Sequence, residues 1–230
     1  MHKALCKICV AEACVNNCIL FDNLKDDEIE VIQPQSQIAY FKRKEKLPAT
    51  GFSTAHVVYI CYGLAKVYIN SPYKKKFLLE IVGRERFITN SLTDFGYSLT
   101  SVTALTDLKV CYFAIEDVMK VAEANPHFAM VLLKQFNING TSRFQRLASI
   151  AIKQTRGRLA DALLYLHHNF KDISIYKLIS RKDLSELANI SNENAIRTLK
   201  DFEKEGVVIT NGKSLEITDL DALIKISQRG

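Results

Sequence analysis

The spacing of hydrophobic residues along the chain changes from a strand-like to a helix-like period near Ala114. Between Phe41 and Ala114, short runs rich in Val, Ile, Tyr, Phe and Thr are separated by turn residues such as Gly63 and Gly83. Regular short strands with this punctuation are typical of a small β-roll or jelly roll. Beyond residue 115 the apolar positions recur at helical spacing. The pattern predicts an α+β chain in which an N-terminal β-roll precedes a set of helices.

A long helical segment follows the predicted roll. It breaks near Asn125 and Pro126, and a proline suits the first turn of a new helix. From Ala129 onward, a stripe of mostly apolar residues recurs at alternating spacings of three and four, the period of a coiled-coil seam. The stripe comprises Ala129, Leu133, Phe136, Gly140, Arg143, Leu147 and Ile150. Because Gly140 and Arg143 interrupt it, packing against the chain's own roll is the alternative. We expect residues 116–152 to form a long dimerisation helix.

Two short helices joined by a tight turn are predicted between residues 180 and 208. Ser180 and Asp183 have the spacing of a capping box, so the first helix should begin there. Asn189 stands where that helix must end, and asparagine tolerates a positive φ better than branched residues do. Ser191 can cap the second helix. The predicted buried stripe of this second helix consists of Ala195, Leu199 and Phe202.

The outer face of the second helix carries groups that can contact DNA. In the major groove Arg pairs with guanine, Asn with adenine and Glu with cytosine. The candidate DNA-binding residues are Ser191, Asn192, Glu193, Asn194, Ile196, Arg197 and Lys200. Asn211 and Gly212, which lie between apolar runs, predict a hairpin after the helix. We therefore expect residues 153–230 to form a winged helix-turn-helix, the alternative being a solvated amphipathic helix with an ordinary hairpin.

This region is similar to a known family. SRKDLSELANISNENAIRTLKDFEKEGVV, residues 180–208, resembles the DNA-binding segment of the Crp/Fnr transcription regulators, with the E-x-x-x-R pattern of their recognition helix at Glu193 and Arg197. RGRLADALLYL, residues 156–166, resembles the segment that opens that domain. The family's usual turn glycine is Asn189 here. The resemblance implies a cyclic-nucleotide-binding-like roll over residues 21–115 and a homodimer that binds a palindromic double-stranded DNA operator. An activator would also contact RNA polymerase.

Composition and charge are compatible with a DNA-binding regulator. The 230 residues carry a net charge of +6, with a pI near 8.9, which permits binding to a polyanion. There is no long apolar run and no apolar signal-peptide region, so we expect a cytoplasmic protein without a membrane partner. Nucleotide-binding glycine loops, a Ser-His-Asp set and an H-x-x-x-H motif are all missing from the sequence. We do not expect an enzyme, and an iron-sulfur electron carrier is the less favoured alternative.

Four cysteines lie within thirteen residues of a cysteine-rich segment at residues 1–20: Cys6, Cys9, Cys14 and Cys18. Closely spaced thiolates are soft ligands, which select zinc or an iron-sulfur cluster. The spacing C-x2-C-x4-C-x3-C matches neither a ferredoxin run nor a zinc ribbon. It therefore predicts a metal site without identifying the metal. These four cysteines could complete a site by themselves, and a segment of free thiols is the alternative.

A second resemblance concerns the metal. CILFDNLKDDEIEVI, residues 18–32, is similar to the segment after the last N-terminal cluster cysteine of the oxygen-sensing Fnr branch, and TALTDLKVCYF, residues 103–113, is similar to the strand with its fourth ligand. The resemblance implies a redox-sensing 4Fe-4S cluster on Cys9, Cys14, Cys18 and Cys111, with Cys6 as an alternate ligand. For Cys111 alone, a small buried hydrophobe is the alternative. Zinc is the alternative cofactor, and haem, with His2 or a cysteine as axial ligand, is the third choice.

The family's cyclic-nucleotide branch holds its ligand with a Gly-Glu pair on the ribose and an Arg-Ser pair on the phosphate. Thr89 and Asn90 stand at the first pair in this chain, and Leu99 and Thr100 at the second. A cyclic phosphate needs a cation or clustered N–H donors in a dry pocket. Because the expected arginine is absent, we disfavour a cyclic nucleotide as the effector. Another small effector could still bind in the roll. Cys61 is expected to be a core residue.

Overall fold

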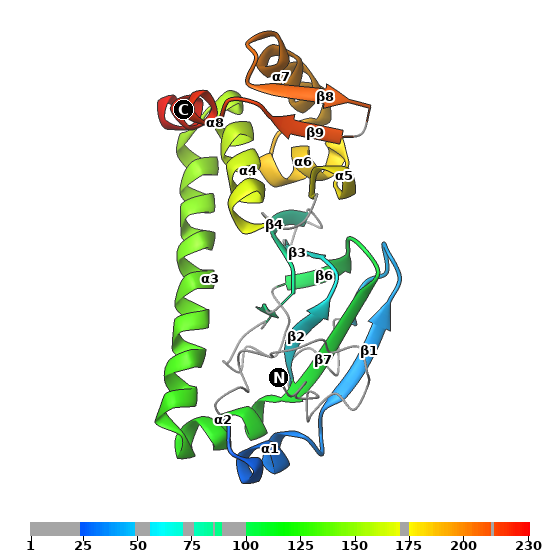
Figure 1. The fold of residues 1–230 in the computed structure, drawn as a ribbon, viewed down its shortest axis with the longest axis vertical. Coiled ribbons are helices and arrows are strands. Elements are labelled where there is room, and N and C mark those ends of the chain that lie inside the picture. Colours follow the sequence, from blue (N-terminus) through cyan, green and yellow to red (C-terminus); the bar gives the residue numbers. More distant parts are fainter. Residues whose placement is uncertain are drawn as a thin grey trace, which may run out of the picture. The chain divides into compact units, whose positions relative to one another are not determined.

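The computed structural model describes residues 24–48, 56–70, 76–84, 86–88, 100–170, 175–212 and 214–230. The chain divides into two compact units, one comprising residues 1–74 and 81–140 and the other residues 75–80 and 141–230. Figure 1 gives the element labels used below. Among the described helices, none has the length and apolar character needed to cross a membrane.

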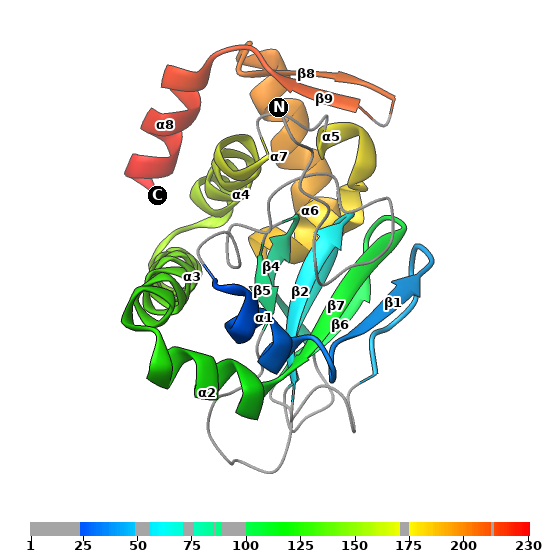
Figure 2. The same ribbon diagram turned by 60° about the horizontal axis from the view of Figure 1, so that its bottom comes forward.

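The strands of the expected β-roll are present. They are β1 (Gln37–Phe41), β2 (His56–Tyr62), β3 (Ala65–Asn70), β4 (Lys76–Val82), β5 (Phe87–Ile88), β6 (Thr100–Ala104) and β7 (Leu108–Ala114). One sheet has the order β1-β7-β2-β5 and the other β4-β3-β6. In the first sheet β7 pairs antiparallel with both β1 and β2, which places Cys111 opposite Ile38 and Tyr59. Figure 2 shows β7 between these two neighbours.

Strand β7 is buried on both faces, which explains its continuous apolar run. Cys111 and Phe113 belong to a cluster that includes residues of α1 (Asp26–Ile32), α2 (Ile115–Ala124) and the start of α3 (Pro126–Ile152). Val110 and Tyr112 belong to a second cluster, shared with residues of both sheets. Because successive side chains of a strand point to opposite faces, both sets must be apolar. The roll therefore has one core between its sheets and another under its helices.

Helix α3 begins where the sequence predicts a break. The Asn125 side chain accepts a hydrogen bond from the Phe128 N–H at 3.0 Å, and Pro126 occupies the first helical position, where no N–H is needed. The expected stripe is only partly exposed. Phe136 packs against the first cluster, and Arg143 pairs with Glu80, so these two positions do not belong to an exposed seam.

The large apolar side chains that α3 exposes include Met130, Leu133, Ile138, Phe144, Leu147 and Ile152. Four of them, Met130, Leu133, Phe144 and Leu147, fit the same alternation of three and four as the expected stripe, and Ile138 and Ile152 do not. Leu133 and Leu147 belong to both stripes. Met130 and Phe144 replace Ala129 and Arg143, one residue further along the chain. The exposed stripe is thus rotated relative to the one expected from sequence, because two of the expected positions pack within their own chain.

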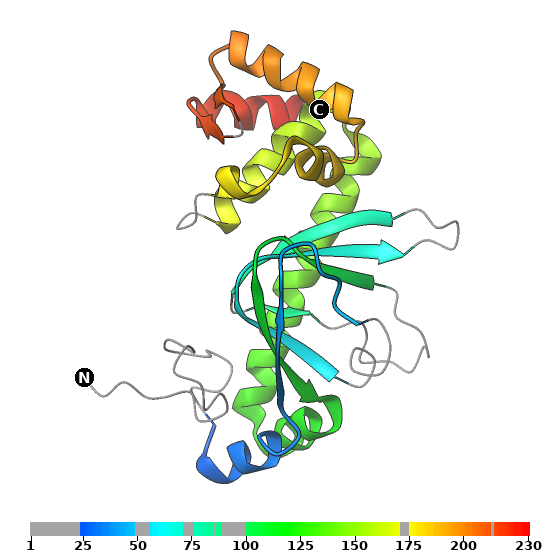
Figure 3. The same cartoon turned by 90° about the vertical axis from the view of Figure 1, so that its right-hand side faces the viewer.

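The second unit contains the predicted helix-turn-helix and hairpin. Its elements after α3 are α4 (Thr155–Asn169), α5 (Ile175–Leu178), α6 (Arg181–Ala188), α7 (Asn192–Lys204), β8 (Val208–Asn211), β9 (Ser214–Ile217) and α8 (Leu220–Arg229). Buried leucines of α4, such as Leu159 and Leu163, and Phe202 of α7 contribute to its apolar interior. Helix α7, orange in Figure 3, lies at the edge of this unit.

Candidate DNA-binding site

The first helix of the motif, α6, begins at the capping box expected from sequence. Ser180 Oγ accepts a hydrogen bond from the Asp183 N–H at 3.1 Å, and an Asp183 carboxylate oxygen accepts one from the Ser180 N–H at 2.8 Å. Two backbone donors that the helix cannot satisfy itself are thereby paired. Leu184, Leu187 and Ala188 are buried, so the apolar face of α6 packs into the unit.

The turn between the two helices depends on a left-handed residue. Asn189 has φ 51° and ψ 49°, and it is the C-cap of α6. Asparagine reaches this region more easily than other residues with a Cβ atom. The prediction that Asn189 ends the helix with positive φ is confirmed. The reversal allows α7 to begin only three residues later, at Asn192.

Helix α7 separates an apolar inner face from a polar outer face. Ser191 caps it, since its side chain accepts a hydrogen bond from the Asn194 N–H at 3.2 Å. Ala195, Leu199 and Phe202 are almost completely buried, as their spacing predicts. The inner stripe fixes the rotation of α7 about its axis, so the opposite face is presented to solvent.

The candidate DNA-binding residues lie on this opposite face. Asn194 is half-buried, and the other six are exposed: Ser191, Asn192, Glu193, Ile196, Arg197 and Lys200. The Arg197 guanidinium donates a hydrogen bond to Asn194 Oδ1 at 2.9 Å. Both groups therefore have a definite placement without DNA, and both keep further hydrogen-bonding capacity. This arrangement suits side chains that contact base edges and phosphates.

Glu193 is ionised over the physiological range. Its pKa lies below the ordinary value because its carboxylate accepts hydrogen bonds from its own backbone N–H and from the Ser191 hydroxyl. A carboxylate in the first turn of a helix is also favoured by the positive end of the helix dipole. As an acceptor without a proton, Glu193 can pair with the amino group of cytosine and would repel phosphate.

Two contacts that sequence reasoning did not identify attach the hairpin to the helices. Glu203 on α7 accepts hydrogen bonds from the N–H and the hydroxyl of Thr210 at 3.0 and 2.9 Å. Arg181 on α6 donates to the carbonyls of Gly212 and Ser214 at 3.4 and 3.3 Å. Asn211 pairs with Ser214 as the last pair of the β8-β9 ladder, so it is a strand residue. The hairpin is thus held against both helices of the motif.

The segment from residue 157 to residue 226 matches the model of the Crp-like helix-turn-helix domain. A CRP-like cAMP-activated global transcriptional regulator from Mycobacterium tuberculosis is 23% identical over 212 residues, which covers 90% of this chain and 95% of that protein. These comparisons support a DNA-binding transcription regulator of the Crp/Fnr family. The relatives that they find are regulators rather than enzymes.

Solved structures of Crp/Fnr regulators have the same fold. A CooA mutant from Carboxydothermus hydrogenoformans superposes with a TM-score of 0.72 at 16% identity, covering 92% of this chain and 96% of that one. FixK2 from Bradyrhizobium japonicum gives a TM-score of 0.70 at 13% identity, covering 83% and 96%. The expected architecture of an N-terminal β-sheet domain, helices and a C-terminal helix-turn-helix is confirmed.

The predicted metal ligands are only partly within the described residues. Cys6, Cys9, Cys14 and Cys18 lie outside them, whereas Cys111 is 1% exposed on β7. Cys61 packs against the same cluster as Cys111, in line with its expected role as a core residue. In the part of the chain that is described, no group of three or more His, Cys, Asp and Glu side chains could hold a metal ion.

The positions compared with the cyclic-nucleotide branch also fall mostly outside the described residues. Thr89, Asn90 and Leu99 are not described. Thr100 is half-buried at the start of β6, where it pairs with Ile69 of β3. The prediction that the roll does not take a cyclic nucleotide therefore stays a prediction.

Proposed function

We propose that this regulator is a homodimer that binds a palindromic operator through Ser191, Asn192, Glu193, Asn194, Ile196, Arg197 and Lys200. The observation that carries the proposal is the division of α7 into two faces. Its apolar stripe is buried, and its amide, carboxylate and cationic groups are exposed together. A helix held in this way can enter the major groove with base-reading groups already placed.

The homodimer is supported by the exposed stripe on α3. Phe144 is 74% exposed and Leu133 60%, which is unusual for large apolar side chains aligned along one helix. A second copy of the same stripe would cover it in a two-fold seam. Two recognition helices, one from each copy, could then contact successive major grooves. Replacing Phe144 by Glu should shift the protein from dimer to monomer in analytical ultracentrifugation, and an unchanged dimer would contradict the seam.

The signal proposed for the regulator is a redox-sensitive 4Fe-4S cluster held by Cys9, Cys14, Cys18 and Cys111. Leu24 packs against the cluster of core residues that contains Cys111, and Cys18 precedes Leu24 by six residues. Six residues span about 20 Å at most, so the length of the chain would allow Cys18 to reach that face. A buried thiol is a soft donor in an apolar setting, which fits an iron-sulfur cluster.

When bound, such a cluster would supply a centre that oxygen or nitric oxide can destroy. The residues of the chain would hold it through thiolates, and Cys6 is the alternate ligand. Zinc on the same cysteines is the second candidate and would give a fixed structure without a redox response. The M. tuberculosis relative is described as cAMP-activated. We propose that this chain does not share that effector, because Leu99 and Thr100 stand where the family's Arg-Ser pair would hold the phosphate.

The metal proposal is tested on protein purified without oxygen. Iron, acid-labile sulfide and zinc are quantified together with the visible absorption spectrum. Iron and sulfide with a visible band that air bleaches would support the cluster, and loss of that band in Cys14→Ser and Cys18→Ser variants would support the ligands. Stoichiometric zinc in colourless protein would contradict the cluster and favour the structural site.

The DNA proposal is tested with an operator selected from a random pool by repeated rounds of binding. Arg197→Ala should reduce the preference for that operator over random DNA by about 1 to 3 kcal/mol, the value of one bidentate contact to a base. Lys200→Ala is the matched variant, because a contact to phosphate weakens binding to all sequences about equally. An equal loss on both DNAs for Arg197→Ala would refute its role in reading sequence.

A further inference from the structure

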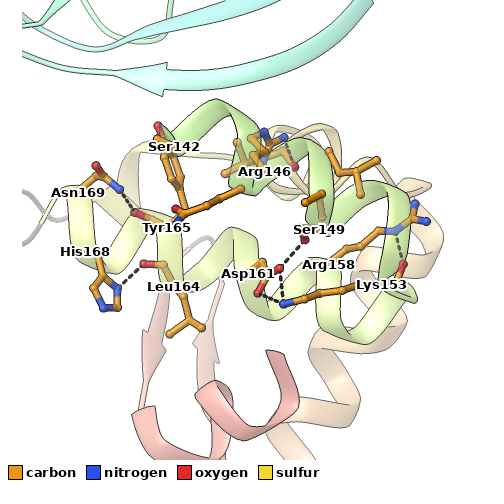
Figure 4. A pocket seen from close by; sticks show the side chains of 15 residues that line it. Ser142, Arg146, Ser149, Lys153, Arg158, Asp161, Leu164, Tyr165, His168 and Asn169 are labelled. Atoms are coloured by element: carbon orange, nitrogen blue, oxygen red, sulfur yellow. Dashed lines mark hydrogen bonds and ion pairs between the residues drawn. The ribbon is translucent and has the colours of Figure 1, made fainter. Parts of the chain in front are cut away.

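A cavity of about 580 Å³ lies inside the second unit, between the C-terminal part of α3, helix α4 and the end of α6. Figure 4 shows side chains that line it, among them Arg146, Arg158, Asp161 and Tyr165. Its volume is within the range of sites that hold small organic ligands. The walls are partly apolar, with Ile150, Leu164 and Leu187 among them. The cavity is separate from the outer face of α7.

The charged side chains around the cavity are not balanced. Apart from His168, the lining contains four side chains of types that are charged at neutral pH: Arg146, Lys153, Arg158 and Asp161. Three of these are cations and one is an anion. The carboxylate of Asp161 is already satisfied: Lys153 donates to it at 2.8 Å, and the hydroxyls of Ser149 and Ser227 also donate to it. Lys153 is thus neutralised, whereas Arg146 and Arg158 form no ion pair with a carboxylate among the described residues, although Glu80 and Asp161 are near enough to oppose the lowering of the Arg146 pKa by burial.

Arg146 is the most unusual of these cations. Its Nη2 donates to the carbonyls of Leu78, at 2.8 Å, and of Leu187, while its buried Nε has no partner among the described residues. Burial lowers the pKa of Arg146 to about 10. Carbonyl dipoles, including one at the C-terminus of α6, offset the charge only in part. A desolvated guanidinium beside an open cavity is strongly attracted to an anion.

Arg158 contributes a second cation to the same lining. Its Nε donates to the Lys153 carbonyl at 2.6 Å, which fixes the guanidinium on α4 while leaving its other nitrogens without a described partner. Arg146 and Arg158 line the cavity from different helices, α3 and α4. We propose that this cavity is a binding site for a small organic anion, with phosphate or carboxylate groups that pair with Arg146 and Arg158 and a partly apolar body.

Such a ligand would have a direct connection to the DNA-reading motif. Leu187 and Ala188 of α6 line the cavity, and Arg146 donates to the Leu187 carbonyl. An anion that pairs with Arg146 would therefore change the contact to Leu187 near the end of α6, two residues before the turn at Asn189.

The site is tested by calorimetric titration of the full chain with pyrophosphate and, separately, citrate, at an ionic strength held constant with chloride. We expect saturable binding of one anion per chain, and the tighter of the two probes identifies phosphate or carboxylate as the preferred group. Arg146→Met and Arg158→Gln should each weaken binding at least tenfold. If Arg146→Met does not fold, Arg158→Gln alone still tests the site, because Arg158 makes fewer contacts within the protein.

Two controls separate this site from general attraction to a basic protein. Arg156→Gln removes the same charge from the same helix at an exposed position, and Arg197→Ala removes a cation from the DNA-reading face; neither should change the affinity. Amide NMR signals of Gln145 and Ser149 should shift on titration of the unmodified protein. Non-saturable binding, or equal affinity in all four variants, would overturn the proposal without affecting the role of α7 in DNA binding.

Discussion

The recognition helix α7 and the junction of α3 with α4 place charged groups in opposite ways. On the outer face of α7 the charged side chains Glu193, Arg197 and Lys200 are exposed. The polar contacts within the helix and its cap join residues three positions apart, such as Arg197 with Asn194. At the junction, Arg143 reaches Glu80, 63 residues away, and Asp161 binds Ser227, 66 residues away. The outer face of α7 leaves groups available to a ligand, whereas the paired charges of Arg143, Glu80 and Asp161 are part of the folded structure.

The largest difference in the effect of substitutions on the free energy of unfolding is expected between the two faces of α7. Phe202→Ala should lower the free energy of unfolding by about 3 to 5 kcal/mol, because Phe202 is fully buried and its removal leaves a cavity. Arg197→Ala, on the outer face, should change it by less than about 0.5 kcal/mol. Urea denaturation followed by circular dichroism measures both. A comparable loss for the two variants would mean that the outer face also contributes to packing.

A second contrast compares a partly buried ion pair with an exposed one. Glu80→Gln should cost about 3 kcal/mol, because the Glu80 side chain is 3% exposed and the change leaves Arg143 without its counter-charge. Glu205→Gln should cost less than about 0.5 kcal/mol, since Glu205 and Arg156 are both nearly half exposed to solvent. The same denaturation experiment applies. Equal effects would show that the pair with Glu80 is solvated in solution.

The difference in sequence separation also decides what can be predicted from sequence. The caps at Ser180 and Ser191, the positive φ of Asn189 and the stripe with Phe202 depend on residues within a few positions of each other, and all were predicted. The strand pattern of the roll follows from the same kind of local rule. Strand β1 was not predicted, because its partly exposed sequence QIAYF has only a weak apolar pattern.

Contacts between distant segments left no local signal. The sequence shows Arg143 only as an interruption of an apolar stripe, whereas in the fold its partner is Glu80. The attachment of Thr210 by Glu203 likewise depends on the path of the hairpin. The cavity around Arg146 draws its lining from three helices, so no single stretch of sequence describes it. The prediction of Cys9, Cys14, Cys18 and Cys111 as ligands rests on sequence resemblance alone and stays a prediction.

A third contrast concerns the turn that joins α6 and α7. Asn189→Ala should destabilise the protein by about 1 kcal/mol, because a Cβ atom is strained at φ 51° and alanine lacks the local hydrogen bonds that favour asparagine there. Asn189→Gly should cost little, since glycine adopts this conformation freely. Thermal unfolding of the two variants under identical conditions distinguishes them. A larger loss with glycine than with alanine would mean that the left-handed conformation is not retained in solution.

The smallest expected effect is the pH dependence of the hairpin attachment. The pKa of Glu203 lies below its ordinary value because its carboxylate accepts hydrogen bonds from the backbone N–H and then the hydroxyl of Thr210. Since this pKa is lowered by folding, the attachment is fully present above the ordinary pKa of a glutamate and is lost as the pH falls through the lowered value. The Thr210 amide signal should therefore titrate below the ordinary glutamate range in NMR spectra, and Glu203→Gln should abolish that titration. A midpoint at or above the ordinary value would show that the exposed contact is too weakly populated to hold β8 against α7, in contrast to the partly buried pairs at the junction.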